Sequence, residues 1–458
     1  MRRTAMKSVG IVVSALSLYC FGSESLPAPD IMLWGRYTLG QVKSSVTEPG
    51  VFDYSFENEW LENIDGGVRL TRAVTPRLLG RLNVGLTVNT STVKQMNFNT
   101  VEFTAKKFTA SLLDASMQYT RDELFTKSGR FQLEFGYFPF KYNPQSTNLG
   151  EYLFRSGTYP GVLVSGFENS IDKPKLGGVH VSYAFNGAFG ELKQDFLLNS
   201  ELDIYPLHDL NFTYIATYTP HPVFTIAGGV EFAHLIVLDS VKTTPGLDPL
   251  FRNSVDQWVG YVDPKTNDTT RYTFKGTKVM ARATLDLKEL IQMGTGRPGF
   301  FGKEDLKLYG EAAILGVKNY PGWYDTLSQR IPVMVGINIP TFKLLDLLSV
   351  EVEQYTSPYW NSQENIWKDH SPVPYTGINN GLNYLSWNDS MAKHDDDIKW
   401  SIYASKKIGT FLRISAQVAS DHTPRNWYTP GPPSFVKYTE MVPRTKDWYY
   451  MTRVSFYF

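Results

Sequence analysis

Hydrophobic and polar residues alternate strictly in many short stretches of this chain. Residues 82–88 read Leu-Asn-Val-Gly-Leu-Thr-Val, and residues 131–137 read Phe-Gln-Leu-Glu-Phe-Gly-Tyr. A period of two is that of a β-strand with one apolar and one polar face. We predict sixteen strands, at 31–40, 64–73, 78–89, 109–120, 130–138, 176–186, 190–199, 209–219, 223–236, 276–287, 305–316, 331–339, 347–356, 397–405, 411–421 and 448–458.

The connections between these strands alternate between short and long. Tight turns are expected at 75–77, 186–189, 219–222 and 407–409. Long polar connections rich in Pro, Gly, Asn and Asp occupy 139–175, 237–275, 357–396 and 422–447. The connection at 288–304 is unusually long for the short-turn end and is expected to hold a short helix. Strands of about ten residues have the length that a tilted strand needs to cross a bilayer, so the pattern favours an antiparallel transmembrane β-barrel of about sixteen strands, with fourteen to eighteen as the range.

Composition narrows the class of protein. Lys and Arg number 45 and Asp and Glu number 45, so no charge bias points to nucleic acid. The mean hydropathy of −0.25 is too low for a helical membrane protein, but it suits a barrel whose inner strand faces meet water. Aromatic residues make up 14% of the chain, which suits the aromatic girdles of such barrels.

The first residues have the three regions of a secretory signal. Arg2, Arg3 and Lys7 precede an apolar run over 9–21, and small or polar residues follow. The run is too short for a membrane-spanning helix. We therefore expect a signal peptide at 1–22, cleaved after Gly22 or Ser25, and a single barrel domain over 23–458. Cys20 would leave with the signal, so the mature protein would have no disulfide.

The last eleven residues are the most specific feature of the sequence. Residues 448–458 read Trp-Tyr-Tyr-Met-Thr-Arg-Val-Ser-Phe-Tyr-Phe, with one largely apolar face and a final aromatic residue. In this the chain resembles the bacterial outer-membrane β-barrel family, and in its strand number the sixteen-stranded porins. The alternative is an edge strand of a large soluble sandwich.

The resemblance implies a location, a function and partners. It implies a barrel in the bacterial outer membrane with periplasmic short turns, acting as a channel for passive diffusion of small hydrophilic solutes. The implied partners are outer-membrane lipid, the small hydrophilic solutes and the barrel-insertion machinery, which would recognise the C-terminal strand. The resemblance also implies a homotrimer as the assembly. It implies no cofactor and no nucleic acid.

Counted along the chain, the connection at 139–175 is the third at the end of the barrel opposite the short turns. In the porins that the chain resembles, the third loop folds into the lumen and sets its narrowest point. Apolar residues of this stretch could pack on the wall while charged residues face the solute. The expected constriction charges are Glu151, Arg155, Glu168, Asp172 and Lys173. The alternative is a surface loop that only covers the barrel mouth.

Charged residues on the inward parity of the strands divide into two groups. A basic arc is expected from Arg36, Arg69, Arg81, Lys399, Arg413 and Arg453, whose strands become neighbours when the barrel closes. Pore-wall acids are expected at Asp114, Glu134 and Glu311. A basic arc facing an acid-bearing loop would create a transverse field that orients dipolar solutes. The alternative is that these charges are scattered and paired with their neighbours.

Two other functions stay open at this stage. Trp34, Tyr309, Tyr355 and Tyr403 point inward by parity and could stack on sugar rings, which would make the protein a carbohydrate-selective channel. Long connections could instead bind surfaces, in a structural or adhesive barrel. Enzymatic activity is not expected: Asp421 and His422 are adjacent and point to opposite faces of a strand, so we predict neither catalytic nor metal-binding residues.

Overall fold

The computed structural model describes residues 28–45, 56–89, 92–94, 102–104, 108–157, 162–165, 174–201, 209–237, 259–272, 275–295, 301–318, 320–321, 323–359, 361, 396–428 and 436–458. The signal peptide expected at 1–22 and both of its cleavage points lie outside these ranges. Among the described residues, no helix is long and apolar enough to cross a membrane.

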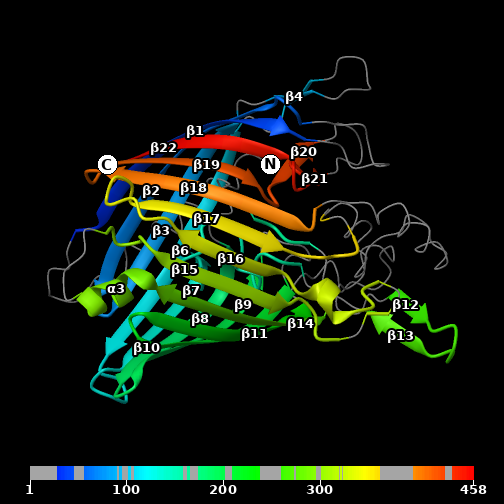
Figure 1. The fold of residues 1–458 in the computed structure, drawn as a ribbon. Helices are drawn as coiled ribbons and strands as arrows, with labels where there is room; N and C mark the ends of the chain where they lie inside the picture. The colour runs from blue at the N-terminus through cyan, green and yellow to red at the C-terminus, as the bar shows by residue number, and fades with distance from the viewer. Residues whose placement is uncertain are drawn as a thin grey trace, which may run out of the picture.

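Sixteen antiparallel strands close into one barrel (Figure 1). In the closed order they are β1 (Asp30–Ser44), β2 (Trp60–Thr75), β3 (Leu78–Asn89), β6 (Phe108–Asp122), β7 (Arg130–Pro139), β8 (Lys175–Gly187), β9 (Gly190–Glu201), β10 (Asp209–His221), β11 (Phe224–Val237), β14 (Gly276–Asp286), β15 (Lys307–Ile314), β16 (Val333–Asn338), β17 (Leu347–Gln354), β18 (Ile398–Ile408), β19 (Leu412–Ser420) and β22 (Trp448–Tyr457). The predicted fold class and all sixteen predicted strands are confirmed.

The barrel closes between its first and last strands. Trp34 pairs with Tyr457, and the register continues to Ser44 opposite Trp448. The N–H groups of Leu33 and Phe458 each donate to the carbonyl oxygen of the other, at 2.8 Å. β1 is longer than the sequence predicted because its pairing with β22 continues beyond Gly40 to Ser44, and β2 is longer because residues 60–63 pair with residues 38–41 of β1. At Gly40 a Cβ atom would lie 2.3 Å from the carbonyl oxygen of Tyr450.

The long connections contain elements that the alternation did not predict. Three separate hairpins join β4 (Thr92–Lys94) to β5 (Glu102–Thr104), β12 (Val259–Val262) to β13 (Thr269–Tyr272), and β20 (Pro424–Tyr428) to β21 (Val436–Glu440). A 3-10 turn, η2 (Leu327–Arg330), precedes β16. The helix expected within 288–304 is present as α3 (Leu287–Thr295), at the short-turn end.

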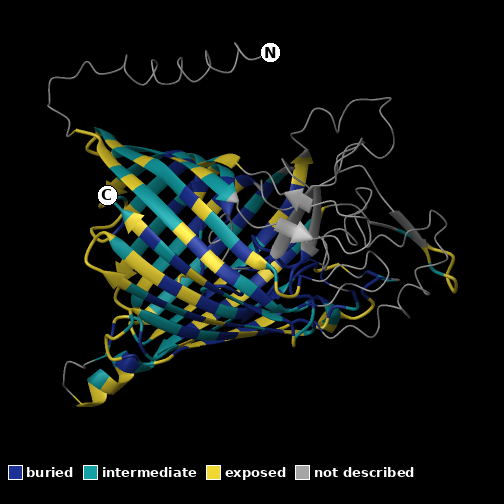
Figure 2. Cartoon of the chain, turned by 90° about the horizontal axis from the view of Figure 1, so that it is seen from above, coloured by how far each residue is buried: buried dark blue, intermediate teal, exposed yellow. Residues whose placement is uncertain are grey.

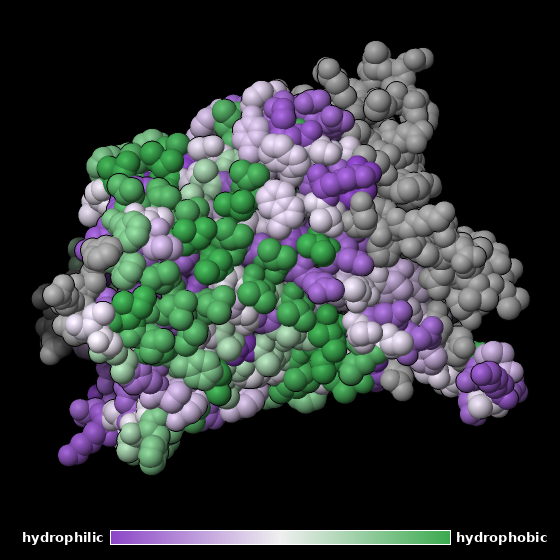
Figure 3. All heavy atoms as spheres, viewed as in Figure 1, coloured by the Kyte–Doolittle hydropathy of each residue, from purple (hydrophilic) through white to green (hydrophobic). Residues whose placement is uncertain are grey.

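Burial alternates along the strands, as Figure 2 shows. In β16, Val333, Val335 and Ile337 are 40%, 52% and 40% exposed, while Met334 and Asn338 are buried. The exposed set is apolar and the inner set includes many polar residues, which is the reverse of a water-soluble protein. Figure 3 shows the resulting apolar surface over the strands. The outer surface of this barrel is therefore suited to lipid.

Candidate channel lining and loop anchors

The wall charges singled out from the sequence all lie on the inner face of the barrel. Each shares its parity with buried neighbours on its strand, such as Arg413 with Ser415 and Gln417 in β19. Strand parity alone accounts for this placement, because successive residues of a strand point to opposite faces. The partners of these charged side chains differ from one part of the barrel wall to another.

The inner face of β1, β2 and β3, which we call the open wall, carries paired arginines. Arg36 Nε lies 3.1 Å from Asp65 Oδ2, and Asp65 also accepts from Thr87 Oγ1 at 2.6 Å. Arg81 contacts Glu134 on β7 and lies 3.8 Å from Asp114 on β6. The expected basic arc therefore contains acids on its own side. Asp65 was missed, although it has the same parity as Arg69 on β2.

Two arginines of the arc are exposed, and both lie in the half of the wall near the short turns. Arg69 is paired with Met32 and Asn83 in the sheet register, and Arg413 lies beside the β18–β19 turn. Trp34 stands on the same open wall. Its ring covers Gly67, where a Cβ atom would lie 2.6 Å from the indole, and its Nε1 donates to Asn83 Oδ1 at 3.0 Å.

Two members of the arc are buried, which corrects the expectation that they line the pore. The Lys399 ammonium donates to the carbonyl oxygens of Val442 and Pro443, at 2.6 and 3.0 Å, and lies 3.3 Å from Glu440. Arg453 is 4% exposed and donates from Nε to Thr38 Oγ1 at 3.1 Å. The segment before β22 packs on the inward-pointing side chain of Lys399 and buries it. Strand parity alone could not predict this burial.

The connection after β7 lies against the inner face of the opposite wall. β7 is fifth in the closed strand order, β15 is eleventh and β17 is thirteenth, so β17 is eight strands from β7 in a circle of sixteen. Residues 140–157 contact inward side chains of β14, β15 and β17, whose inner faces we call the covered wall. The connection therefore reaches from β7 to strands on the far side of the circle.

Glu311 on β15 is the first anchor of this connection. Its carboxylate accepts hydrogen bonds from the Tyr142 hydroxyl at 2.5 Å and from the Asn143 side-chain amide at 2.8 Å. It also accepts from the backbone N–H groups of Glu151 and Tyr152, at 3.2 and 2.9 Å. Four donors satisfy both oxygens of one buried carboxylate.

Glu351 on β17 is the second anchor. It accepts from three consecutive backbone N–H groups, those of Thr147, Asn148 and Leu149, at 2.5, 2.9 and 2.9 Å. The Tyr309 hydroxyl donates to it as well, at 2.9 Å. Three successive N–H groups form a concave binding site for an anion, and here a wall carboxylate occupies it.

A lysine completes the attachment. Lys278 on β14 donates to the carbonyl oxygens of Leu153 and Ser156, at 2.8 and 3.0 Å, and lies 3.1 Å from Glu231. The wall thus offers acceptors to the N–H groups of the connection and a donor to its carbonyl groups. Apolar residues fill the same contact, with Leu149 and Leu153 fully buried.

The two expected constriction charges that the structure describes are both buried. Glu151 is 0% exposed and accepts from the Asn143 backbone N–H, and Arg155 is 2% exposed and donates to the Asn148 carbonyl oxygen at 2.9 Å. Burial raises the pKa of Glu151 to about 7, opposed by the charge of Lys141 and reinforced by that of Glu311. Glu168, Asp172 and Lys173 lie outside the described residues.

Other side chains of the connection are accessible. Pro144 is exposed, and Lys141, Gln145 and Thr147 are half-buried. They lie among the residues that Glu311 and Glu351 hold, but their side chains are less covered than that of Glu151. The sequence offered one signal for this, the polar run Asn143–Thr147 without an apolar residue other than proline.

A buried histidine joins several connections near the long-loop end. His422 follows β19, and its Nε2 and Nδ1 each lie 2.7 Å from a carboxylate oxygen, of Glu353 and Glu440 respectively. Its backbone exchanges hydrogen bonds with Ser165, at 2.9 and 3.2 Å. Burial alone would lower the pKa of His422, but Glu440 and Glu353 raise it to about 9. Both ring nitrogens are engaged, which suits a structural role better than a proton-transfer role.

The inward aromatic residues are not equally accessible. Tyr309, Tyr355 and Tyr403 are 2%, 5% and 9% exposed, whereas Trp34 is half-buried on the open wall. Three of the four aromatics considered for sugar stacking are therefore covered. Asp421 also has structural partners, because it accepts from Asn148 Nδ2 at 2.6 Å and from the Tyr449 hydroxyl at 2.8 Å.

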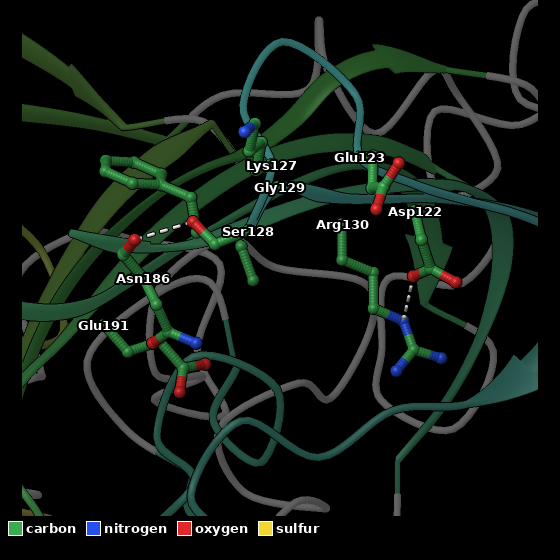
Figure 4. A pocket seen from close by; sticks show the side chains of 10 residues that line it. Asp122, Glu123, Lys127, Ser128, Gly129, Arg130, Asn186 and Glu191 are labelled. Atoms are coloured by element: carbon green, nitrogen blue, oxygen red, sulfur yellow. Dashed lines mark hydrogen bonds and ion pairs between the residues drawn. The ribbon is translucent and has the colours of Figure 1, made fainter.

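A pocket of about 360 Å³ lies at the short-turn rim (Figure 4). It lies between the β6–β7 and β8–β9 turns, where Ser128 donates to the carbonyl oxygen of Asn186 at 2.6 Å and Arg130 lies 3.7 Å from Asp122. The side chains of Arg130 and Asp122 are 63% and 74% exposed, so the pocket is a polar recess of the rim. In the described ranges no cluster of three or more His, Cys, Asp or Glu side chains could hold a metal ion.

Comparison with known proteins gives no family. No protein-family model and no curated protein matches the chain. Among solved structures, two variants of the Rhodopseudomonas blastica porin align over 94% of this chain and 100% of theirs, at 8% identity and TM-scores of 0.39 and 0.41. A structure described for the asymmetric conductivity of engineered proteins aligns equally widely, at 8% identity and a TM-score of 0.41. These values are too low to carry a conclusion, so the functional interpretation rests on the chain itself.

Proposed function

We propose that this protein is a bacterial outer-membrane channel for passive diffusion of small hydrophilic solutes, with the 140–174 connection narrowing its lumen. The observation that carries the proposal is the attachment of that connection, through Glu311 and Glu351, to the wall opposite its origin. A barrel of sixteen strands is wide enough to leave an aqueous channel, and a filter for small solutes needs an element inside it. The proposal includes no enzymatic activity.

The lining that we propose differs from the one expected from sequence. The narrow region would lie between the open wall, with Arg36, Arg69 and Arg81, and the accessible part of the connection, with Lys141 and Gln145. Glu151 and Arg155 would hold the connection in place. The expected signal peptide, outer-membrane lipid, the barrel-insertion machinery at β22 and a homotrimer belong to the same proposal.

The carbohydrate-selective alternative loses support from the burial of Tyr309, Tyr355 and Tyr403. Trp34 is the one residue of that set that a sugar could still reach. The adhesive alternative remains the rival to be tested, because its loops fall mainly outside the described residues.

The test is to shorten the connection. Replacing 146–168 by a Gly-Ser turn removes the residues held by Glu351 and should raise the single-channel conductance in planar bilayers. The matched control replaces the β12–β13 turn, 263–268, which belongs to a separate hairpin at the same end, and should leave the conductance unchanged. A folded protein that passes no ions with or without the connection would support the adhesive alternative.

A further inference from the structure

The helix α3 stands at the short-turn rim, where the other connections are tight turns or short loops. It follows β14 directly, and Asp286 Oδ1 accepts from the Glu289 backbone N–H at 3.2 Å, which caps the helix start. In Figures 1 and 2 the helix projects beyond the circle of strands. It does not enter the lumen, and the channel proposal gives it no role.

The polar face of α3 packs on the protein. Lys288 is buried, and its ammonium donates to the Lys303 carbonyl oxygen at 2.8 Å and lies 3.6 Å from Asp286. Gln292, one turn later on the same face, is half-buried. A helix that covers a water-soluble core turns its apolar face inward, and α3 does the opposite.

The apolar face of α3 is turned away from the protein. Leu287, Leu290 and Ile291 occupy positions i, i+3 and i+4 and so share one face. Leu290 and Ile291 are 51% and 43% exposed. This inverted polarity is the same as that of the barrel wall, where apolar side chains point outward.

The apolar face of α3 also adjoins the apolar surface of the wall. Leu285, two residues before the helix, is paired with Phe224 and Leu308, whose side chains are 39% and 38% exposed. The neighbouring β16–β17 connection adds Phe342 and Leu344, which are 52% and 78% exposed. The lipid-facing surface thus extends past the strand ends onto the rim.

We propose that α3 is an interfacial membrane helix, whose Leu287–Leu290–Ile291 face inserts into the lipid leaflet around the short-turn rim. A helix of nine residues is about 13 Å long, which is too short to span a bilayer and suits a position at the headgroup boundary. The inference rests on the part of the proposed function that places the barrel in a membrane, and it does not depend on solute passage.

The test uses single cysteines in a Cys20→Ser background, each labelled with an environment-sensitive fluorophore. The full barrel is reconstituted into phosphatidylcholine vesicles, with or without bromine on the upper part of the acyl chains. Ile291→Cys probes the apolar face of α3. Glu289→Cys, on the opposite side of the same helix and with a side chain that is 37% exposed, is the matched control. Val335→Cys, on the outer face of β16, reports whether the barrel is in the bilayer.

The expected result is a blue-shifted label at Ile291→Cys that brominated lipid quenches and aqueous iodide does not, with the reverse at Glu289→Cys. Iodide quenching at Ile291→Cys while Val335→Cys is quenched by bromine would overturn the helix proposal and leave the channel proposal intact. A disulfide between two unlabelled Ile291→Cys chains in vesicles would overturn it in favour of a second copy as the partner. Quenching by brominated lipid at both Ile291→Cys and Val335→Cys, in a protein that conducts no ions in planar bilayers, would support the helix proposal and contradict the channel proposal.

Discussion

The open wall and the covered wall follow the same rule of strand parity, yet their charges do different things. On the open wall, Arg36 and Arg81 keep 17% and 28% of their side-chain surface exposed and pair with acids of the neighbouring strands. On the covered wall, Glu311 and Glu351 are 3% and 0% exposed and accept hydrogen bonds from residues some 160 and 200 positions away. The strand decides the face to which a charged side chain points, whereas the segments that cover the side chain decide what it binds.

This difference separates the residues that would hold the channel's shape from those that would act on the solute. Hydrogen bonds to a charged group contribute more to stability than bonds between neutral groups. Removing the buried charge also leaves its donors with neither water nor a protein acceptor. Exposed ion pairs contribute little to stability and are screened by salt. Substitutions on the covered wall should therefore change folding, and those on the open wall should change ion selectivity.

The largest effect is expected on the covered wall, from Glu351→Ala. It leaves the N–H groups of Thr147, Asn148 and Leu149 without their acceptor, and hydrogen bonds to a charged group are worth about 1.5–3 kcal/mol each. We expect the free energy of unfolding in urea to fall by several kcal/mol and trypsin to cleave the connection at Arg155. Arg69→Ala, on the open wall, is the control that should do neither. Equal stability of the two variants would contradict the comparison.

The second effect concerns the open wall. The triple variant Arg36→Gln, Arg69→Gln, Arg81→Gln removes the arginine partners of Asp65, Asp114 and Glu134, so the reversal potential under a salt gradient should shift toward cation selectivity. The shift should be larger at 0.01 M than at 0.1 M salt, because the screening length falls from about 30 Å to about 10 Å. Asp65→Asn should shift the potential the opposite way. An unmoved reversal potential in both variants would mean that ions do not pass this wall.

A third, smaller effect is a pH dependence at the His422 junction. The pKa of His422 rises from about 6.5 to about 9 on folding. A group whose folded pKa is raised contributes stability that is complete below its unfolded pKa and disappears as the pH rises through the folded pKa. Wild-type barrels should thus lose stability between about pH 6.5 and pH 9, measured by thermal unfolding in detergent. His422→Gln should lack this component, and an identical pH profile in the variant would rule it out.

The smallest effect is a second pH dependence, at Glu151. Its pKa rises from 4.5 to about 7 in the folded protein, mainly through burial. By the same linkage, the contribution is complete below pH 4.5 and is lost by about pH 7. Glu151→Gln keeps a neutral side chain there, so its stability should change less than that of the wild type between pH 4.5 and 7. Lys141→Gln should instead raise the pKa of Glu151 and move the wild-type decline to higher pH.

The sequence predicted the strands of the barrel wall far better than the connections that pack on its inner face. All sixteen strands were predicted, and the inward parity of Arg36, Glu134 and Glu311 followed from a period of two, which every strand repeats. The burial of Glu151, Arg155 and Lys399 could not be predicted in the same way. It depends on contacts such as Lys399 with Val442 and Pro443, which no local pattern encodes.

The junction at His422 shows the same limit. We considered His422 only against its neighbour Asp421, because adjacency is what a sequence displays. Its actual partners, Glu353 on β17 and Glu440 at the end of β21, lie 69 and 18 positions away. The inward direction of Asp65 could have been predicted from strand parity, but Asp65 was not among the predicted wall charges.

The pairing of β1 with β22 has a consequence for the order of folding. Thr38 and Arg453 are in contact across 415 positions, so this seam is among the most non-local contacts that the chain makes. Contacts of such separation form late, after local hairpins have appeared, because a long loop must be closed first. Until then the chain has two unpaired strand edges, which are ready templates for aggregation. A cell that makes this protein must therefore keep it apart from other chains until residue 457 has been synthesised and the seam has formed.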